Sequence, residues 1–139
     1  MIQRDKILIG GRALVALGSS RNTNDTDYLV NDITTNSPFM FDTEKNVDYI
    51  NANGHPFFNE IYQLEKGKQI ASPQSLLELK AFSFVMHCKH MNWKKVSDCE
   101  YDMAFLVREF NLKGCSLVKK YVSESEFVEI EKEIKSIRK

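Results

Sequence analysis

Two aspartates, Asp25 and Asp27, stand one residue apart just before the apolar run Tyr28-Leu29-Val30. Like charges this close repel each other, so the pattern indicates either an exposed loop or a bound cation. If both lie on a strand, its two-residue period puts their side chains on one face of a sheet. A third acid, Asp48, occupies the strand-like stretch Val47-Asp48-Tyr49-Ile50. Were the two strands neighbours, the three carboxylates would converge on one spot.

Three carboxylates held together need a divalent cation, and their hard oxygen atoms select Mg²⁺ or Mn²⁺. The chemistry of such a cluster is two-metal phosphoryl or nucleotidyl transfer, in which the ions hold the attacking and leaving oxygens. Gly18-Ser19, a few residues upstream, would let backbone N–H groups and a hydroxyl approach a triphosphate. The alternatives are a solvated strand end for the aspartate pair and a backbone-capping role for Asp48.

The elements that must position these carboxylates can be predicted from the first half of the chain. Alternating apolar residues predict strands, clusters of Gly, Ser, Asn and Thr predict turns, and Gly10-Gly11 permits a sharp change of direction before a short buried helix. The expected order is strand 6–9, helix 12–17, turn 18–24, strand 25–30, polar loop 31–38, strand 39–41, strand 46–51 and a tight turn at 53–54. Residues 56–64 fit either a helix or a loop.

The second half reads as helical. Ser72-Pro73 places a capping residue and a proline at the start of one helix, and a second helix is expected over about 94–110. Ser123 to Glu126 form a capping box that opens a last helix with one apolar stripe. The sequence therefore predicts an α+β fold in one domain, 1–139, with an α/β half (1–70) and a helical half (71–139). The apolar stripe, Phe127, Ile130, Ile134 and Ile137, could dock on a second subunit as well as on its own core.

Composition sets few limits on function. Nineteen basic and nineteen acidic residues cancel, so the net charge favours neither nucleic acid nor membrane as a partner. The three cysteines, Cys88, Cys99 and Cys115, are odd in number and unpatterned, which favours a reducing compartment. Nothing approaches the roughly 20 apolar residues of a membrane helix. We therefore expect a cytoplasmic protein without a membrane partner.

Residues 10–30 resemble the nucleotidyltransferase superfamily related to DNA polymerase beta. The likeness is to its small bacterial, archaeal and phage branch, which includes toxin-type nucleotidyltransferases of abortive-infection systems. Those proteins carry a short helix after Gly-Gly and then a G-x-x-R-x-T-x-D-x-D-hydrophobic run, matched here by Gly18, Arg21, Thr23, Asp25 and Asp27. The resemblance implies a mixed sheet flanked by helices. It also implies that both aspartates are catalytic ligands of Mg²⁺ or Mn²⁺, with Asp48 as the third acid.

The resemblance extends loosely downstream. The segment from Ser72 to Lys80 looks like the family helix that offers a lysine to the nucleotide phosphates, so Lys80 takes that role. Lys94-Lys95 followed by Asp98 and Asp102 is similar to the family's lysine-then-aspartate stretch, without deciding which aspartate corresponds. The implied nucleotide-binding residues are Gly18, Ser19, Arg21, Thr23 and Lys80. Three further residues are candidates for supporting these side chains without contacting the nucleotide: Lys95, Asp98 and Asp102.

The implied reaction moves a nucleoside monophosphate from a triphosphate such as ATP to an acceptor hydroxyl. The acceptor could be an RNA 3′ end such as that of tRNA, a protein, or a small molecule. The alternative is a catalytically silent nucleotidyltransferase fold that serves as a binding or regulatory module, for example in phage–host conflict. A homo-oligomer or a protein partner stays open under both readings.

Two other signals lie between residues 80 and 99. The positive run Lys80, His87, Lys89, His90, Lys94 and Lys95 is typical of a solvated face, unless it borders the carboxylates, where it would attract triphosphate or RNA. The spacing of its histidines and of Cys88 and Cys99 fits no standard zinc site. Trp93, in the expected helix connection, is interpreted as a packing residue.

Overall fold

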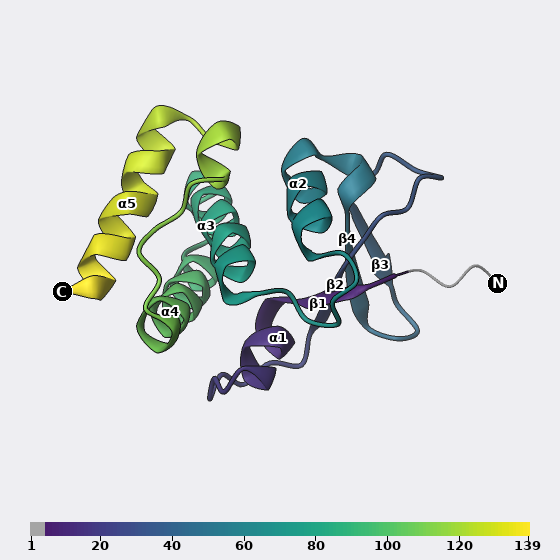
Figure 1. The fold of residues 1–139 in the computed structure, drawn as a ribbon, viewed down its shortest axis with the longest axis horizontal. Coiled ribbons are helices and arrows are strands. Elements are labelled where there is room, and N and C mark those ends of the chain that lie inside the picture. Colours follow the sequence, from purple (N-terminus) through teal and green to yellow (C-terminus); the bar gives the residue numbers. More distant parts are fainter. Residues whose placement is uncertain (1–4) are drawn as a thin grey trace. The chain divides into compact units, whose positions relative to one another are not determined.

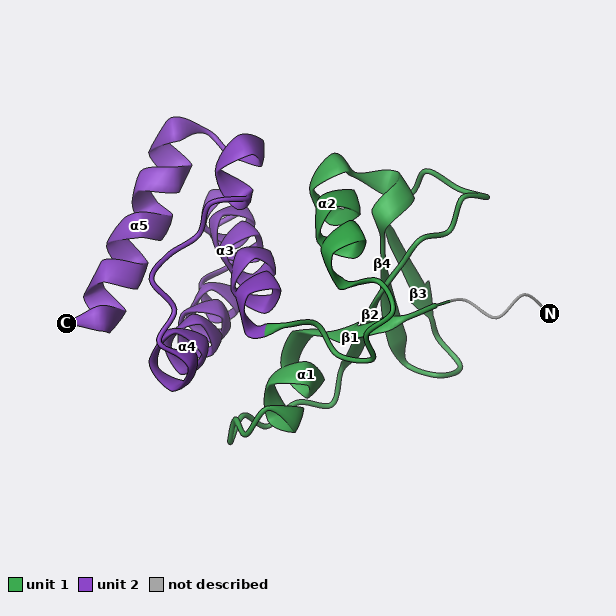
Figure 2. Cartoon of the chain, in the orientation of Figure 1, with its two compact units in different colours: residues 1–72 green, residues 73–139 purple. Residues whose placement is uncertain are grey.

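The computed structural model describes residues 5–139 and divides into two compact units, residues up to Ser72 and residues from Pro73 onward (Figure 2). Together the described residues hold a four-stranded mixed sheet and five α-helices, which confirms the predicted α+β class. Within 5–139, every helix is too short or too polar to cross a membrane.

The first unit contains the sheet, two α-helices and a 3-10 turn (Figure 1). Its elements are β1 (Ile7–Ile9), α1 (Gly10–Ala16), β2 (Thr26–Val30), β3 (Phe39–Asp42), β4 (Val47–Asn51), η1 (Ala52–Gly54) and α2 (Pro56–Glu65). The strand order is β1-β2-β4-β3, with β2 and β4 parallel and both outer pairs antiparallel. All four predicted strands are confirmed. The ambiguous stretch 56–64 is helical, and α1 begins two residues before the predicted helix.

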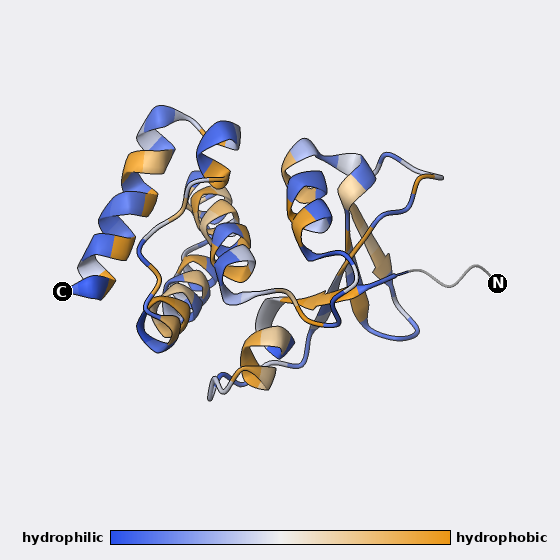
Figure 3. Cartoon of the chain, in the orientation of Figure 1, coloured by the Kyte–Doolittle hydropathy of each residue, from blue (hydrophilic) through white to orange (hydrophobic). Residues whose placement is uncertain are grey.

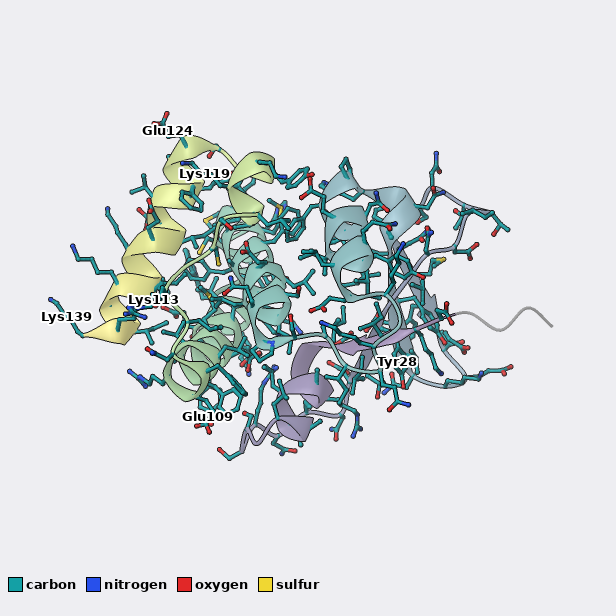
Figure 4. The ribbon with its side chains drawn as sticks, in the orientation of Figure 1. Tyr28, Glu109, Lys113, Lys119, Glu124 and Lys139 are labelled. Atoms are coloured by element: carbon teal, nitrogen blue, oxygen red, sulfur yellow. The ribbon has the colours of Figure 1, made fainter. Side chains whose placement is uncertain are left out.

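The register divides the sheet residues into two faces. One row across the sheet joins Ile7, Leu29, Ile50 and Phe39 as successive partners. The Phe39 ring lies 5.7 Å from that of Phe58 on α2, edge to face, so α2 packs on this row. The other face carries Tyr28 (labelled in Figure 4), whose ring stacks on that of Tyr49 at 6.3 Å. One face of the sheet is therefore packed by α2, while the other keeps its two tyrosines half-buried.

A single buried amide organises the polar loop 31–38. Asn51, the last residue of β4, is fully buried, and its Nδ2 donates to the carbonyls of Asp32, Thr35 and Ser37 at 3.1–3.2 Å. Its Oδ1 accepts from the N–H groups of Asp32 and Asn53 at 2.8 and 3.2 Å. Because an unsatisfied buried amide is costly, these bonds fix the loop against the end of β4.

The second unit is helical and comprises α3 (Pro73–Lys89), α4 (Trp93–Phe110), η2 (Val118–Tyr121) and α5 (Glu124–Arg138). The capping box predicted at Ser123 is present, with Glu126 as its second member. The predicted apolar stripe of α5 is buried against α3 and α4, so this helix docks on the core of its own unit (Figure 3 shows the stripe as orange segments). The interpretation of Trp93 as packing is wrong, since it is 61% exposed as the first residue of α4.

The buried carboxylate of Glu78 on α3 ties down the connection between α4 and α5. Its Oε1 accepts from the N–H of Val118 at 2.9 Å, and its Oε2 accepts from the N–H of Ser116 at 3.0 Å. The Nε2 of Gln74 donates to the same Oε2 at 3.1 Å. Burial, together with the charge of Glu78 and a hydrogen bond to it, raises the pKa of the neighbouring Cys115 thiol well above its usual range. The Cys115 side chain is therefore expected to stay in the thiol form at neutral pH, whereas the thiolate is the nucleophilic form.

Candidate active site

The sheet brings two of the three predicted carboxylates side by side. Asp27 of β2 and Asp48 of β4 are register partners in the parallel pair. Such partners lie on strands about 4.8 Å apart and direct their side chains to the same face. The row continues to Ile9 on one side and to Phe41 on the other. Two half-buried carboxylates therefore stand together in a row with two apolar residues.

The glycine pair at the start of α1 makes room for this site. Gly10 has φ +69°, a left-handed conformation that favours glycine, and a Cβ there would overlap the Oδ2 of Asp27. A Cβ on Gly11 would lie 3.0 Å from Arg21 Nη1 and from Thr23 Cγ2. The Asp27 carboxylate thus lies against the backbone where α1 begins, and the two motif side chains Arg21 and Thr23 lie against the next residue.

The segment between α1 and β2 is held by its own backbone and hydroxyl groups. Gly18, at φ +111°, donates its N–H to the carbonyl of Val15 at 3.0 Å. The buried Ser19 accepts from the N–H of Arg21 at 3.1 Å through Oγ. Thr23 Oγ1 accepts from the N–H of Asp25 at 3.3 Å. Both hydroxyls therefore stabilise turns in the described structure, and their contact with a nucleotide stays a prediction.

The fit to Mg²⁺ rests on two carboxylates. Among residues 5–139, no three His, Cys, Asp or Glu side chains are gathered into a group that could hold a metal ion. Asp25 is exposed, immediately before β2, and its role as third ligand stays a prediction. Mg²⁺ is commonly held by one or two carboxylates plus substrate phosphates, and not by an all-protein cage. Asp27 and Asp48 fit that pattern.

In the helical unit, the structure distinguishes the two candidate aspartates. Lys80 Nζ on α3 lies 2.9 Å from Oδ2 of Asp102 on α4, and the Asp102 side chain is fully buried. Asp98 instead pairs with the exposed Lys94 at 3.3 Å. Lys95 is exposed. The nucleotide-binding role of Lys80, and the supporting roles of Lys95, Asp98 and Asp102, stay predictions.

The pairing of Lys80 with Asp102 was not predicted, although the sequence carries a signal for it. Lys80 lies nine residues before Lys89, where α3 ends, and Asp102 lies nine residues after Trp93, where α4 begins (89 − 80 = 102 − 93 = 9). Consecutive helices joined by a short loop run antiparallel, so residues equidistant from the turn lie at the same level along the two helices. The position of the helix connection would therefore have placed Asp102 among the few candidate partners of Lys80.

No protein-family model matches the chain, and comparisons with curated proteins and with solved structures also give no match. Its function must therefore be inferred from this chain's own residues.

Proposed function

We propose that this protein is a metal-dependent nucleotidyltransferase that moves a nucleoside monophosphate from a triphosphate to an acceptor hydroxyl. The observation that supports it best is the register pairing of Asp27 with Asp48, next to the bare backbone of Gly10. Like charges directly opposite each other destabilise a sheet. The pairing of Asp27 with Asp48 is therefore explained best by a bound cation, which would neutralise both carboxylates.

In the proposed reaction, the acceptor oxygen forms a bond to the α-phosphorus of the triphosphate. The bond from that phosphorus to the oxygen bridging to the β-phosphate breaks, and pyrophosphate leaves with its electron pair. A bound Mg²⁺ or Mn²⁺ would supply charge neutralisation at the phosphate oxygens. Little covalent chemistry is left to the protein, so positioning and electrostatics supply most of the rate.

Each residue of the pair takes a distinct part. Asp27, lying against Gly10, would hold the cation in a fixed place, because the backbone of α1 restricts its carboxylate. Asp48 would complete the metal site and accept the proton of the acceptor hydroxyl. Asp25 is proposed as a further ligand contributed from the segment before β2. Arg21, beside Gly11, would offer a cation to the phosphates.

The test is a transfer assay with each α-labelled nucleoside triphosphate, Mg²⁺ or Mn²⁺, and a mixture of total RNA and cell protein. We expect label in one acceptor class with the parent protein and none with Asp27→Asn/Asp48→Asn. The matched control is Glu44→Gln, which changes an exposed acid in the turn between β3 and β4 and should transfer as the parent does. Equal labelling by the parent and the double variant would overturn the proposal.

Binding is measured separately from transfer. A thermal-unfolding series with a non-hydrolysable triphosphate should show a rise in Tm only when Mg²⁺ or Mn²⁺ is also present, and only in proteins that keep both aspartates. Metal-dependent binding without transfer would indicate the silent binding module. The absence of both metal-dependent binding and transfer would contradict the enzyme hypothesis and the binding-module hypothesis alike.

A further inference from the structure

The connection between α3 and α4 forms a tight tip of defined shape. α3 ends at Lys89 and α4 begins at Trp93. The intervening backbone is closed by N–H bonds from His90 to the carbonyl of Met86 (3.2 Å), from Met91 to Cys88 (3.1 Å) and from Asn92 to His87 (2.9 Å). Met91 adopts φ +55° to make the turn. We call residues 89–95 the hairpin tip.

Positive charge gathers on the hairpin tip. No acid occurs between Glu78 and Asp98, a stretch that holds four lysines and two histidines. Four of these residues are exposed: Lys89, His90, Lys94 and Lys95. Within residues 5–139, Lys94 is the one of the four that forms an ion pair, and its partner is Asp98. Burial lowers the pKa of the nearby His87, and the charges of Lys95, Lys80 and His90 lower it further. The charges of Lys95, Lys80 and His90 therefore make the potential around His87 positive, which favours an anion there. Lys89 instead lines a cavity together with Glu126 and Glu129 of α5.

An exposed aromatic ring lies within this charge. Trp93 is 61% exposed and is followed directly by Lys94 and Lys95. Met91, two residues earlier, is 71% exposed. With well over half of its surface exposed, the Trp93 side chain is only partly accounted for by packing in the core. An aromatic ring flanked by cations is the pairing by which proteins hold single-stranded nucleic acid, with bases stacked on the ring and phosphates on the lysines.

We propose that the hairpin tip binds single-stranded nucleic acid, with a base stacked on Trp93 and phosphates held by Lys89, Lys94 and Lys95. Seven residues make a short site, so we expect it to contact only a few nucleotides. Because the phosphates would be held by lysines, the affinity should fall as the salt concentration rises. The inference concerns binding alone and does not depend on the proposed transfer.

The chain offers a direct readout, because Trp93 is its only tryptophan. We would titrate the protein at low salt with twelve-nucleotide oligouridylate and oligothymidylate and follow tryptophan fluorescence. A stacked base should quench the emission, and the apparent affinity should fall steeply as salt rises. Quenching by anionic phospholipid vesicles, with none by either oligonucleotide, would overturn the proposal in favour of a membrane surface.

Two matched variants test the lysines. Lys94→Gln/Lys95→Gln should reduce the slope of log affinity against log salt by roughly 1.4, because each phosphate contact formed with a single strand releases about 0.7 of a counterion and this variant loses two such contacts. Lys119→Gln/Lys120→Gln removes the same charge from η2, where both residues are exposed (Lys119 is labelled in Figure 4). It should leave the slope near the parent value. Equal effects of the two double variants would reduce the binding to net charge and contradict the proposal.

The aromatic contact is tested by anisotropy of a labelled oligonucleotide, which needs no tryptophan. Trp93→Ala should weaken binding about five-fold to a hundred-fold, the range for one stacked base, while Trp93→Phe should retain most of it. Tyr101→Ala, which removes another exposed aromatic from α4, should bind as the parent does. Asp27→Asn/Asp48→Asn should also bind as the parent does, so failure of this inference is distinguishable from failure of the proposed transfer.

Discussion

Lys80 and Asp102 form an ion pair across α3 and α4, with Nζ 2.9 Å from Oδ2 and the aspartate fully buried. Lys80→Met would leave a buried carboxylate without its lysine, at a cost of about 3–5 kcal/mol in the free energy of unfolding. Lys80→Met/Asp102→Leu should cost clearly less than the sum of the two single variants, since it removes both charges. Urea unfolding of the four proteins measures the coupling.

The surface pair on α4 serves as the control for that cycle. Lys94 and Asp98 are 3.3 Å apart, with the lysine side chain 84% exposed. Lys94→Met should change the free energy of unfolding by less than about 1 kcal/mol. Strict additivity of the Lys80 and Asp102 substitutions would show that the buried pair makes no specific contribution.

Gly10 should tolerate no side chain. Gly10→Ala forces a left-handed φ on alanine, which costs about 1–2 kcal/mol, and its Cβ displaces the Asp27 carboxylate. We expect a lower Tm, and also a loss of transfer activity larger than the unfolded fraction explains. Gly114→Ala is the control, because a Cβ there meets nothing within 4 Å and the residue has no positive φ. A Gly10→Ala protein with parental stability would contradict the close approach of the two residues.

The carboxylate pair should cost the protein stability when no cation is bound. Asp48→Asn removes the like charge opposite Asp27, so the free energy of unfolding in chelator should rise by a few tenths to about 1 kcal/mol. The same variant should lose transfer activity. Guanidinium unfolding measures the first effect, with Glu44→Gln as the control. A destabilised Asp48→Asn protein would mean that Asp48 accepts a hydrogen bond that the fold requires.

Glu133 should make stability fall as pH rises towards neutrality. Burial, a hydrogen bond with Glu100 and the charge of Glu100 raise the pKa of Glu133 from 4.5 to about 7. A raised carboxyl pKa means that the native state holds the proton more tightly than the unfolded state does. The protonated Glu133 side chain therefore stabilises the native state at low pH, and this contribution to the free energy of unfolding is lost between about pH 4.5 and 7.

Glu133→Gln replaces the titrating carboxyl group with an amide that is uncharged at every pH. The variant should have a higher Tm than the parent at pH 8, and the difference should shrink as the pH falls through the window above. Thermal unfolding at pH 5, 6, 7 and 8 follows it, with Glu131→Gln, an exposed acid on the same helix, as control. A constant difference at all four pH values would show that the effect is not due to the proton.

The local elements were predictable because their signals are local. Alternating apolar residues marked β2 and β4, and the capping box at Ser123 marked the start of α5. The pairing of β2 with β4 was not predictable, because the sequence pattern of a strand does not specify which strand lies next to it. The prediction was conditional, that Asp25, Asp27 and Asp48 would converge if their strands were adjacent. The register confirms the adjacency for Asp27 and Asp48, whereas Asp25 lies just before β2 and is not part of the row.

Other features escaped prediction because they depend on tertiary contacts. Asn51 looks like an ordinary polar strand end, yet it is fully buried and bonds five backbone groups. Glu78 reads as a helix-surface acid, yet it is 3% exposed and holds a connection some 40 residues away. The packing role predicted for Trp93 was wrong because it rested on the general tendency of hydrophobic side chains to be buried. The two lysines that follow it, Lys94 and Lys95, are a local signal for an exposed position.

The parallel pairing of β2 with β4 also sets the order in which the sheet can assemble. β3 and β4 form a hairpin whose first pair, Asp42 and Val47, lies five residues apart, whereas Asp27 and Asp48 lie 21 apart (48 − 27 = 21). Because closing a longer loop costs more chain entropy, the hairpin forms more readily than the β2–β4 ladder. We therefore expect the two carboxylates to meet late in folding. A chain whose β2–β4 ladder has not formed carries both aspartates without holding them side by side.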